Sequence, residues 1–145
     1  MQPPKREEIV NVRTYMHPEP VTANTRDGAH QTFRRMCERG IRHMPVLGDD
    51  GRLVGIVSDR DLRRPDTLDD DPNVVHPYLL DNHVKVEQIM TPDPVTVEVD
   101  DDVRRALDLL VTRRYGALPV IDQGRLVGII STVDLLRAFR DHLLR

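Results

Sequence analysis

A chain of 145 residues has room for one compact domain, and its net charge of −3, with both signs interspersed, excludes a basic surface for nucleic acid. Three Tyr, two Phe and no Trp leave few rings to stack on bases, which also argues against nucleic acid. Cys37 is the only cysteine, so no disulfide forms within the chain and a reducing, cytoplasmic location is expected. No apolar run approaches the roughly 20 residues that span a bilayer, so no membrane association is expected.

Residues 1–11 begin with polar residues and prolines, which predicts an N-terminal tail that leans on the domain. Residues 12–22 include two prolines, which forbid a helix there and predict an extended lead-in to a short strand. A helix is predicted from about Asp27 to Arg39, with Thr25 or Asp27 as its N-cap. Its buried stripe is predicted from helical spacing to consist of Ala29, Phe33, Met36, Cys37 and Gly40. Cys37 is therefore interpreted as a core residue and not as a reactive thiol.

Two strands are predicted next, at residues 42–47 and 53–57, joined by a hairpin turn at residues 48–51. A short helix should begin after Ser58 and end at Pro65. Residues 65–85 are predicted to form an acidic, irregular connector. Its apolar side chains are expected to pack back on the domain; they are Val74, Val75, Tyr78, Leu79 and Leu80.

The second half of the chain, residues 86–145, repeats this order. Its long helix is predicted at about residues 101–114, capped by Asp100, with a core-facing stripe of Val103, Ala106, Leu107, Leu110 and Val111. Strands are predicted at residues 118–121 and 126–130, followed by a helix from about Thr132 to near the C-terminus. The last helix has a surplus apolar side, which predicts packing on another subunit or on the N-terminal tail; its residues are Leu135, Leu136, Phe139 and Leu143.

An internal duplication explains why the two halves share this order. The stretch GRLVGIVSDRDL at residues 51–62 recurs as GRLVGIISTVDL at residues 124–135, an offset of 73. Upstream of the hairpin turn the offset is 74, so that Met16 corresponds to Met90. Halves of roughly 50 to 60 residues would be marginally stable alone, so the two halves should share a core.

The Ser-x-x-Asp that follows the last strand of each half is the candidate binding motif. A helix N-terminus offers N–H groups to a phosphate, a glycine in the preceding strand lets a ligand approach closely, and a carboxylate can accept from two hydroxyls. The motif is also a capping box, with Ser58 paired with Asp61 and Ser131 with Asp134, and a cap needs no ligand. Arg60 is either a phosphate ligand or a solvated surface charge.

The order of strand, helix, strand, strand and helix, twice over, resembles a tandem pair of cystathionine-β-synthase (CBS) domains. The resemblance rests on HMPV at residues 43–46 and ALPV at residues 117–120, each ahead of a Gly-hydrophobic-hydrophobic-Ser-x-x-Asp-Leu motif. It implies an α/β (α+β) fold in which two pseudo-symmetric β-α-β-β-α repeats, residues 12–64 and 86–145, form one CBS-pair (Bateman) module. The length is similar to that of stand-alone bacterial and archaeal CBS pairs, including the acetoin-utilisation-protein-like group.

In that family, clefts between the repeats often hold adenosine compounds, and modules commonly pair into a disc-shaped homodimer. The resemblance implies that the ribose and phosphate contacts are Asp61, Ser58, Arg60, Asp134 and Ser131. It implies that the adenine slots are lined by Val95, Met90, His43, Pro45, Val21, Met16, Ala117 and Pro119. The lead-in of one repeat should complete the site of the other, so that Met90 and Val95 wall the Asp61 site and Met16 and Val21 wall the Asp134 site.

The two sites are expected to differ in their preference for phosphate. The Asp61 site has His43 and Arg60 where the Asp134 site has Ala117 and Val133. An arginine can hold a phosphate as a charged fork and a valine cannot. The Asp61 site should therefore hold a phosphorylated nucleotide better.

The leading hypothesis is a non-enzymatic regulatory module that binds AMP, ADP or ATP, has no obligatory cofactor, and signals through a homodimer to an unknown protein target. One alternative ligand is S-adenosylmethionine or a dinucleotide such as NAD. A further alternative is a ligand-free interaction scaffold in which the Ser-x-x-Asp motifs only cap helices. The sequence has no recognisable pair of nucleophile and base and no histidine pair with metal-ligand spacing, so neither catalysis nor a metal site is expected.

Overall fold

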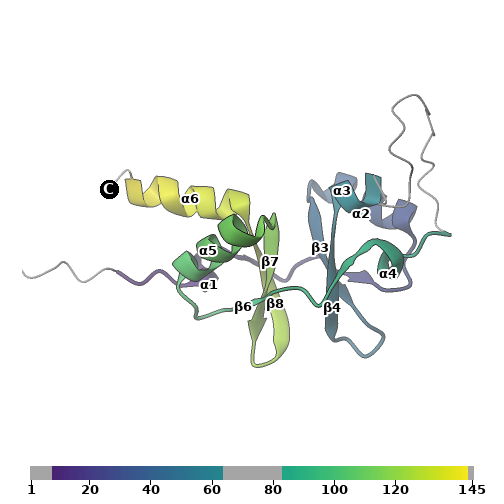
Figure 1. The fold of residues 1–145 in the computed structure, drawn as a ribbon, viewed down its shortest axis with the longest axis horizontal. Helices are drawn as coiled ribbons and strands as arrows, with labels where there is room; N and C mark the ends of the chain where they lie inside the picture. Colours follow the sequence, from purple (N-terminus) through teal and green to yellow (C-terminus); the bar gives the residue numbers. More distant parts are fainter. Residues whose placement is uncertain (1–7, 64–82, 144–145) are drawn as a thin grey trace, which may run out of the picture. The chain divides into compact units, whose positions relative to one another are not determined.

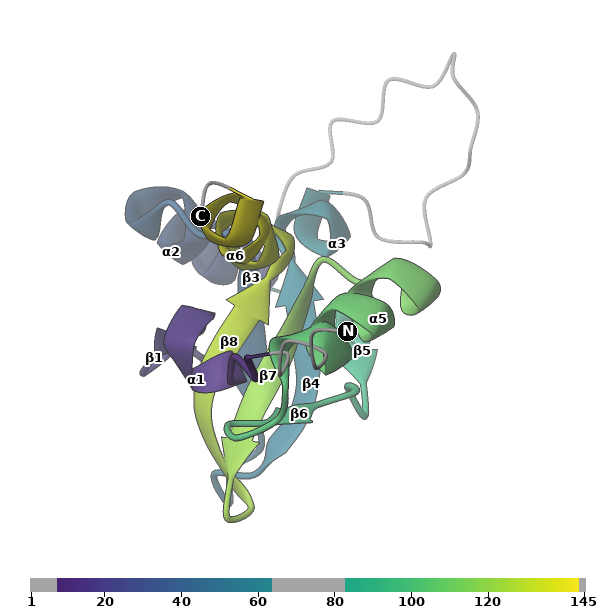
Figure 2. The same cartoon turned by 90° about the vertical axis from the view of Figure 1, so that its left-hand side faces the viewer.

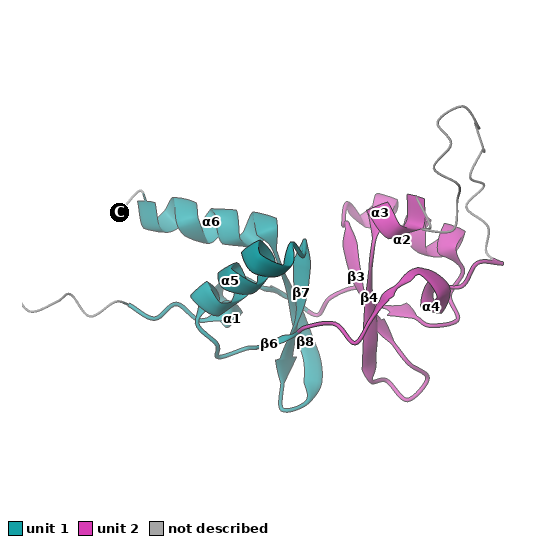
Figure 3. Ribbon diagram, viewed as in Figure 1, with its two compact units in different colours: residues 1–18, 96–145 teal, residues 19–95 magenta. Residues whose placement is uncertain are grey.

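The computed structural model describes residues 8–63 and 83–143, and it has the mixed α/β architecture expected from the sequence (Figure 1). The described chain divides into two compact units, drawn in two colours in Figure 3. Unit 1 comprises residues 1–18 and 96–145, and unit 2 comprises residues 19–95. The apolar residues of the connector, which were expected to pack back on the domain, lie outside the described residues.

Unit 2 is built on a four-stranded sheet in the order β2-β3-β4-β5, in which β2 and β3 are parallel and the other neighbours antiparallel. Its elements in chain order are β2 (Ala23–Asn24), α2 (Ala29–Arg39), β3 (His43–Leu47), β4 (Leu53–Ser58), α3 (Asp59–Arg63), α4 (Val86–Ile89) and β5 (Thr91–Pro92).

Unit 1 repeats this plan with the sheet order β1-β8-β7-β6. Its elements are α1 (Val12–Tyr15), β1 (His17–Pro18), β6 (Val97–Glu98), α5 (Val103–Arg113), β7 (Ala117–Asp122), β8 (Arg125–Ser131) and α6 (Thr132–Leu143). Helix α6 contacts both α5 and α1, and these helices lie around the β7–β8 hairpin (Figure 2).

Each unit contains segments from both halves of the duplicated sequence. Strand β1 of the first half pairs with β8, and β5 of the second half pairs with β4. The backbone N–H of Val12 donates to the Asp101 carbonyl at 2.9 Å, and the equivalent bond from Val86 to Asp27 is also 2.9 Å long. The halves therefore share their sheets, as the marginal size of a single half requires.

Helix α2 starts two residues later than predicted, and its N-cap is Gly28 and not Thr25 or Asp27. The Asp27 carboxylate instead accepts from the backbone N–H of Asn24 at 2.9 Å, so it closes the turn before the helix. The buried stripe contains Thr32, whose hydroxyl donates to the Gly28 carbonyl at 2.9 Å. The prediction that Cys37 belongs to the core is wrong, because it lies at the exposed edge of the stripe centred on Met36.

Helix α5 also begins later than predicted. Its N-cap is Asp102 and not Asp100: the Asp102 carboxylate accepts from the Arg104 backbone N–H at 2.9 Å, and that bond lowers the pKa of Asp102. Only part of the predicted stripe is buried, since Leu107 is 46% and Val111 68% exposed.

The lead-ins of the two halves differ from the prediction in one respect. Each contains a single helical turn, α1 in the first half and α4 in the second, ahead of the short strand. The turn in the first half fits before Pro18, so the prolines restrict only the residues that follow it.

Candidate functional site

Three of the predicted site residues, His43, Pro45 and Ser58, lie along one face of the unit 2 sheet. In the antiparallel register of β3 and β4, His43 lies opposite Ser58 and Pro45 opposite Ile56. Residues that are directly opposite in an antiparallel pair project their side chains from the same face. Asp61 follows on α3, immediately after β4.

Ser58 and Asp61 form the reciprocal bonds of a capping box. The Ser58 backbone N–H donates to Oδ2 of Asp61 at 2.9 Å, and the Asp61 backbone N–H donates to Oγ of Ser58 at 3.1 Å. Asp61 is half-buried, and no donor from the described part of the chain bonds its Oδ1. One oxygen of this carboxylate thus holds the local turn, while the other accepts no bond from the described residues.

The surroundings of Asp61 combine a neutral imidazole with two arginines. Burial lowers the pKa of His43, and this outweighs the opposite effect of the carboxylates of Asp59 and Asp61. Arg42 is exposed, and its carbonyl accepts from the backbone N–H of Asp59 at 2.9 Å, which places Arg42 where α3 begins. Arg60 is exposed on α3 itself.

Arg42 was missed by the sequence reasoning, although the repeat offset could have revealed it. Its counterpart in the second half is Gly116, whose carbonyl accepts the equivalent bond from Thr132 at 3.1 Å. The Asp61 site therefore has two arginines at positions where the Asp134 site has Gly116 and Val133.

Asp134 in unit 1 has a different environment from Asp61. Its side chain is 1% exposed, and its Oδ2 accepts from both the backbone N–H and the hydroxyl of Ser131, at 2.8 and 2.9 Å. Its Oδ1 lies 3.1 Å from Nε2 of His17 and 3.3 Å from a guanidinium nitrogen of Arg137. His17 was not among the predicted site residues.

The glycines within β4 and β8 accommodate methionines of the exchanged lead-ins. A Cβ added at Gly128 would lie 2.6 Å from the sulfur of Met16, and one added at Gly55 would overlap the sulfur of Met90. Met90 also packs against the core of unit 2. The expectation that these glycines let a ligand approach closely is therefore wrong, because methionine side chains fill that space.

The remaining predicted slot residues are divided between the units. Ala117 and Pro119 are buried in β7 of unit 1. Val95 is half-buried at the end of unit 2, and Val21, which was expected beside Met16, packs against the core of unit 2.

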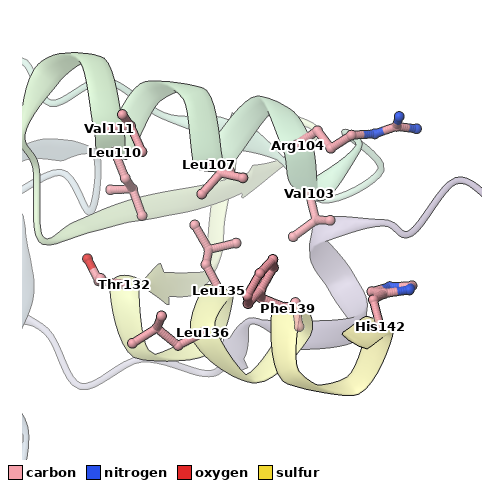
Figure 4. Close-up of a pocket in the computed structure, with 11 residues that line it drawn as sticks. Val103, Arg104, Leu107, Leu110, Val111, Thr132, Leu135, Leu136, Phe139 and His142 are labelled. Atoms are coloured by element: carbon pink, nitrogen blue, oxygen red, sulfur yellow. The ribbon is translucent and has the colours of Figure 1, made fainter. Parts of the chain in front are cut away.

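An apolar pocket lies elsewhere in unit 1, between α5 and α6 (Figure 4). Its volume is about 500 Å³, and its apolar lining includes Leu107, Leu110, Val111, Leu135, Leu136 and Phe139. Figure 4 shows Leu107 of α5 facing Leu135 and Phe139 of α6 across the pocket. The sequence indicated surplus apolar surface on the last helix, but not a hollow beside it.

The part of the chain that the structure describes contains neither a group of metal-ligating side chains nor a helix that could span a membrane. Within residues 8–63 and 83–143, no three His, Cys, Asp or Glu side chains are grouped so that they could hold a metal ion. In the same part of the chain, no helix combines the length and the apolar character needed to cross a bilayer.

Two segments of the chain, residues 12–65 and 86–141, match the CBS domain family. A CBS domain-containing protein of Dictyostelium discoideum is 34% identical over 137 residues, which cover 88% of this chain and 89% of that protein. An uncharacterized protein of Methanocaldococcus jannaschii is 30% identical over 140 residues, and the chain spans only 49% of its length.

Solved structures share the fold. The CBS domain pair of the protein MJ0100, in complex with 5′-methylthioadenosine and S-adenosyl-L-methionine, has a TM-score of 0.77 at 24% identity and covers 93% of this chain and 99% of that one. The structure of CBSX2 in complex with AMP has a TM-score of 0.73 at 25% identity and covers 91% of this chain and 97% of that one.

Proposed function

This chain belongs to the CBS domain family, and from that premise we propose that it is a non-enzymatic regulatory module that binds an adenosine nucleotide, AMP, ADP or ATP, at Asp61. The observation that carries the proposal is Oδ1 of Asp61, which accepts no bond from the described residues and belongs to a segment where His43 has a lowered pKa and both Arg42 and Arg60 are exposed. A carboxylate oxygen accepts hydrogen bonds from ribose hydroxyls, and guanidinium groups attract phosphate.

Three features of the site support a phosphorylated adenosine ligand. The half-buried His43 lies beside the buried Pro45 on one sheet face, which gives adenine a largely apolar surface with one polar group. The arginines of this site have no counterparts in the other half of the chain. The structural relative CBSX2, which has the same fold, was solved in complex with AMP.

The module is further proposed to act as a homodimer that contacts an unknown protein target. The pocket between α5 and α6 is bordered by exposed apolar side chains, among them Leu136 at 61% and Phe139 at 62% exposure. One face thus supplies both a hollow and the side chains that would fill it. A twofold interface needs this self-complementarity, so a second copy of the chain is the proposed occupant.

Ligand binding can regulate such a dimer only if the nucleotide binds two arrangements with different affinity. The bonds that Asp61 makes to Ser58 order the start of α3, and a ribose bound at Oδ1 would add to that order. Nucleotide binding is therefore proposed to stabilise one conformation of unit 2.

Calorimetric titration with AMP and with ATP tests the proposal. The wild type should bind at least one of them, and Asp61→Ala should weaken that binding about tenfold to a hundredfold, since a hydrogen bond to a charged group contributes about 1.5–3 kcal/mol. Asp49→Ala is the matched control, because it removes the same charge from an exposed position of unit 2.

Asp61→Asn guards against a folding defect in the alanine variant, because its side-chain oxygen can still accept from Ser58. Equal affinity of the wild type and both Asp61 variants would remove Asp61 from the site. A larger thermal shift with S-adenosylmethionine or NAD than with AMP or ATP would identify a different ligand, and no shift with any of them would favour the scaffold.

A further inference from the structure

The two Ser-x-x-Asp motifs are equivalent in sequence but differ in how fully their carboxylates are occupied. A carboxylate has about four lone-pair sites. At Asp134, Oδ2 accepts two bonds from Ser131, while Oδ1 accepts one from Arg137 at 3.3 Å and lies 3.1 Å from Nε2 of His17. At Asp61 a single bond, from the Ser58 backbone, is made among the described residues.

The difference originates in the exchanged lead-in strands. His17 on β1 lies opposite Ile129 of β8, and Thr91 on β5 lies opposite Ile56 of β4, so His17 and Thr91 occupy equivalent positions. The first lead-in therefore brings an imidazole to Asp134, whereas the second brings a small hydroxyl to the corresponding position in unit 2.

This difference determines which carboxylate can accept from a ligand. The Asp134 side chain is only 1% exposed, so a ribose could reach its carboxylate only by displacing the neighbouring side chains. Unless the ribose hydroxyls replaced every lost interaction, the buried carboxylate would be left with fewer hydrogen bonds, which costs free energy. A ribose at Asp61 would meet an oxygen that the described chain leaves available.

We propose that His17 closes the unit 1 site to ribose, so that the chain binds one adenosine nucleotide and binds it at Asp61. This inference rests on the proposed function and adds a specificity-determining residue to it. His17 acts by occupying Oδ1 of Asp134, and Arg137 assists from the following turn of α6. Of the two duplicated Ser-x-x-Asp motifs, only the one at Asp61 then binds a nucleotide.

Exchanging the two lead-in residues tests the inference. His17→Thr gives unit 1 the residue that unit 2 has at this position, and calorimetric titration with AMP measures the number of sites. The wild type should bind one AMP per chain, and His17→Thr should bind a second one more weakly. That second binding event should disappear in His17→Thr/Asp134→Ala.

The reciprocal variant, Thr91→His, places an imidazole beside Asp61 at an exposed position, where it should not disturb folding. It should weaken AMP binding about tenfold, because the new donor competes for Oδ1. Thr91→Ser is its control, since it keeps a small hydroxyl.

The outcomes separate this inference from the proposed function. A wild type that binds two AMP per chain, or a His17→Thr variant that still binds one, would overturn the role of His17 while leaving nucleotide binding intact. Unchanged affinity in Thr91→His would overturn it as well, even if His17→Thr failed to fold. A wild type that binds neither AMP nor ATP would instead count against the proposed function, and one that binds only ATP would be titrated with ATP in the same variants.

Discussion

At the scale of single residues, His43 links the proposed site to pH. Burial lowers its pKa below the usual 6.5, so as the pH falls through that value the unfolded chain takes up a proton that the folded chain resists. Where the unfolded state binds more protons than the folded state, the free energy of unfolding decreases as the pH falls. The stability contributed by the neutral His43 is therefore fully present above pH 6.5 and is lost as the pH falls through the folded pKa.

We therefore predict that the free energy of unfolding of the wild type decreases more steeply between about pH 7.5 and about pH 5.5 than that of His43→Ala. The largest slope one group can add is about 1.4 kcal/mol per pH unit. Urea unfolding at both pH values measures it, and His30→Ala, on the exposed side of α2, controls for loss of a histidine. Parallel pH profiles for the wild type and His43→Ala would contradict the prediction.

Candidate site residues could be predicted from the sequence where the same motif occurs in both halves, and they were missed where the halves differ. Ser58 and Asp61 could be located because the same motif recurs behind the same strand. His17 is part of no repeated motif, and its role depends on a contact with Asp134, which belongs to the other half of the chain. The repeat offset pairs His17 with Thr91, so a residue-by-residue comparison of the halves would have marked the difference.

At the scale of elements, the exchanged lead-ins depend on the glycines in β4 and β8. A Cβ at Gly128 would lie 2.6 Å from the sulfur of Met16 and 2.9 Å from the carbonyl oxygen of His17. Since the second of these atoms belongs to the backbone of β1, an alanine could not be accommodated by a side-chain movement alone. The glycine thus allows β1 to pair closely with β8.

Gly128→Ala is accordingly predicted to lower the free energy of unfolding by about 1–3 kcal/mol, the usual range for overpacking a buried site. Part of that loss should be recovered in Gly128→Ala/Met16→Ala, because the shortened side chain removes one of the two contacts. Denaturant unfolding of the four proteins in this mutant cycle provides the measurement. Strict additivity would show that Met16 is not the obstacle.

Element boundaries show where pattern reasoning fails. The hydrophobic pattern located the hairpins and α6 closely, because burial on one face is written directly in the sequence. The helix caps were misassigned because an acidic residue before a helix can also close the preceding turn. Asp27, a predicted cap of α2, does so by accepting from the Asn24 backbone N–H at 2.9 Å. At α5 it is Asp101 that closes the preceding turn, accepting from the Glu98 backbone N–H at 2.8 Å, while the predicted cap, Asp100, pairs with Arg13 at 3.2 Å.

At the scale of the whole molecule, the duplication has diverged most on the outer faces of the helices. In unit 2 the guanidinium of Arg63 lies 5.5 Å from the centre of the Phe33 ring. The equivalent positions in unit 1 are Leu136 and Leu107, which are 61% and 46% exposed. All of the large apolar side chains found exposed in the described residues belong to unit 1.

From this asymmetry we expect the proposed homodimer to form through α5 and α6 of unit 1. A cation over an aromatic ring keeps the equivalent face of unit 2 polar, whereas the leucines leave an apolar face that is characteristic of an interface. If the two faces have diverged in this way, an arginine placed on the apolar face of unit 1, at the position equivalent to Arg63, should prevent two chains from associating.

Leu136→Arg introduces into unit 1 the residue type found at the equivalent position of unit 2, and it is predicted to convert a dimer into a monomer. Because Leu136 is 61% exposed, the change should alter the free energy of unfolding of the monomer little, and urea unfolding checks this. Sedimentation velocity over a range of protein concentrations gives the mass, with Arg140→Ala as the control on a residue of α6 outside the pocket lining. A wild type that stays monomeric, or a Leu136→Arg variant that keeps the dimer mass, would show that this apolar face does not bind a second copy.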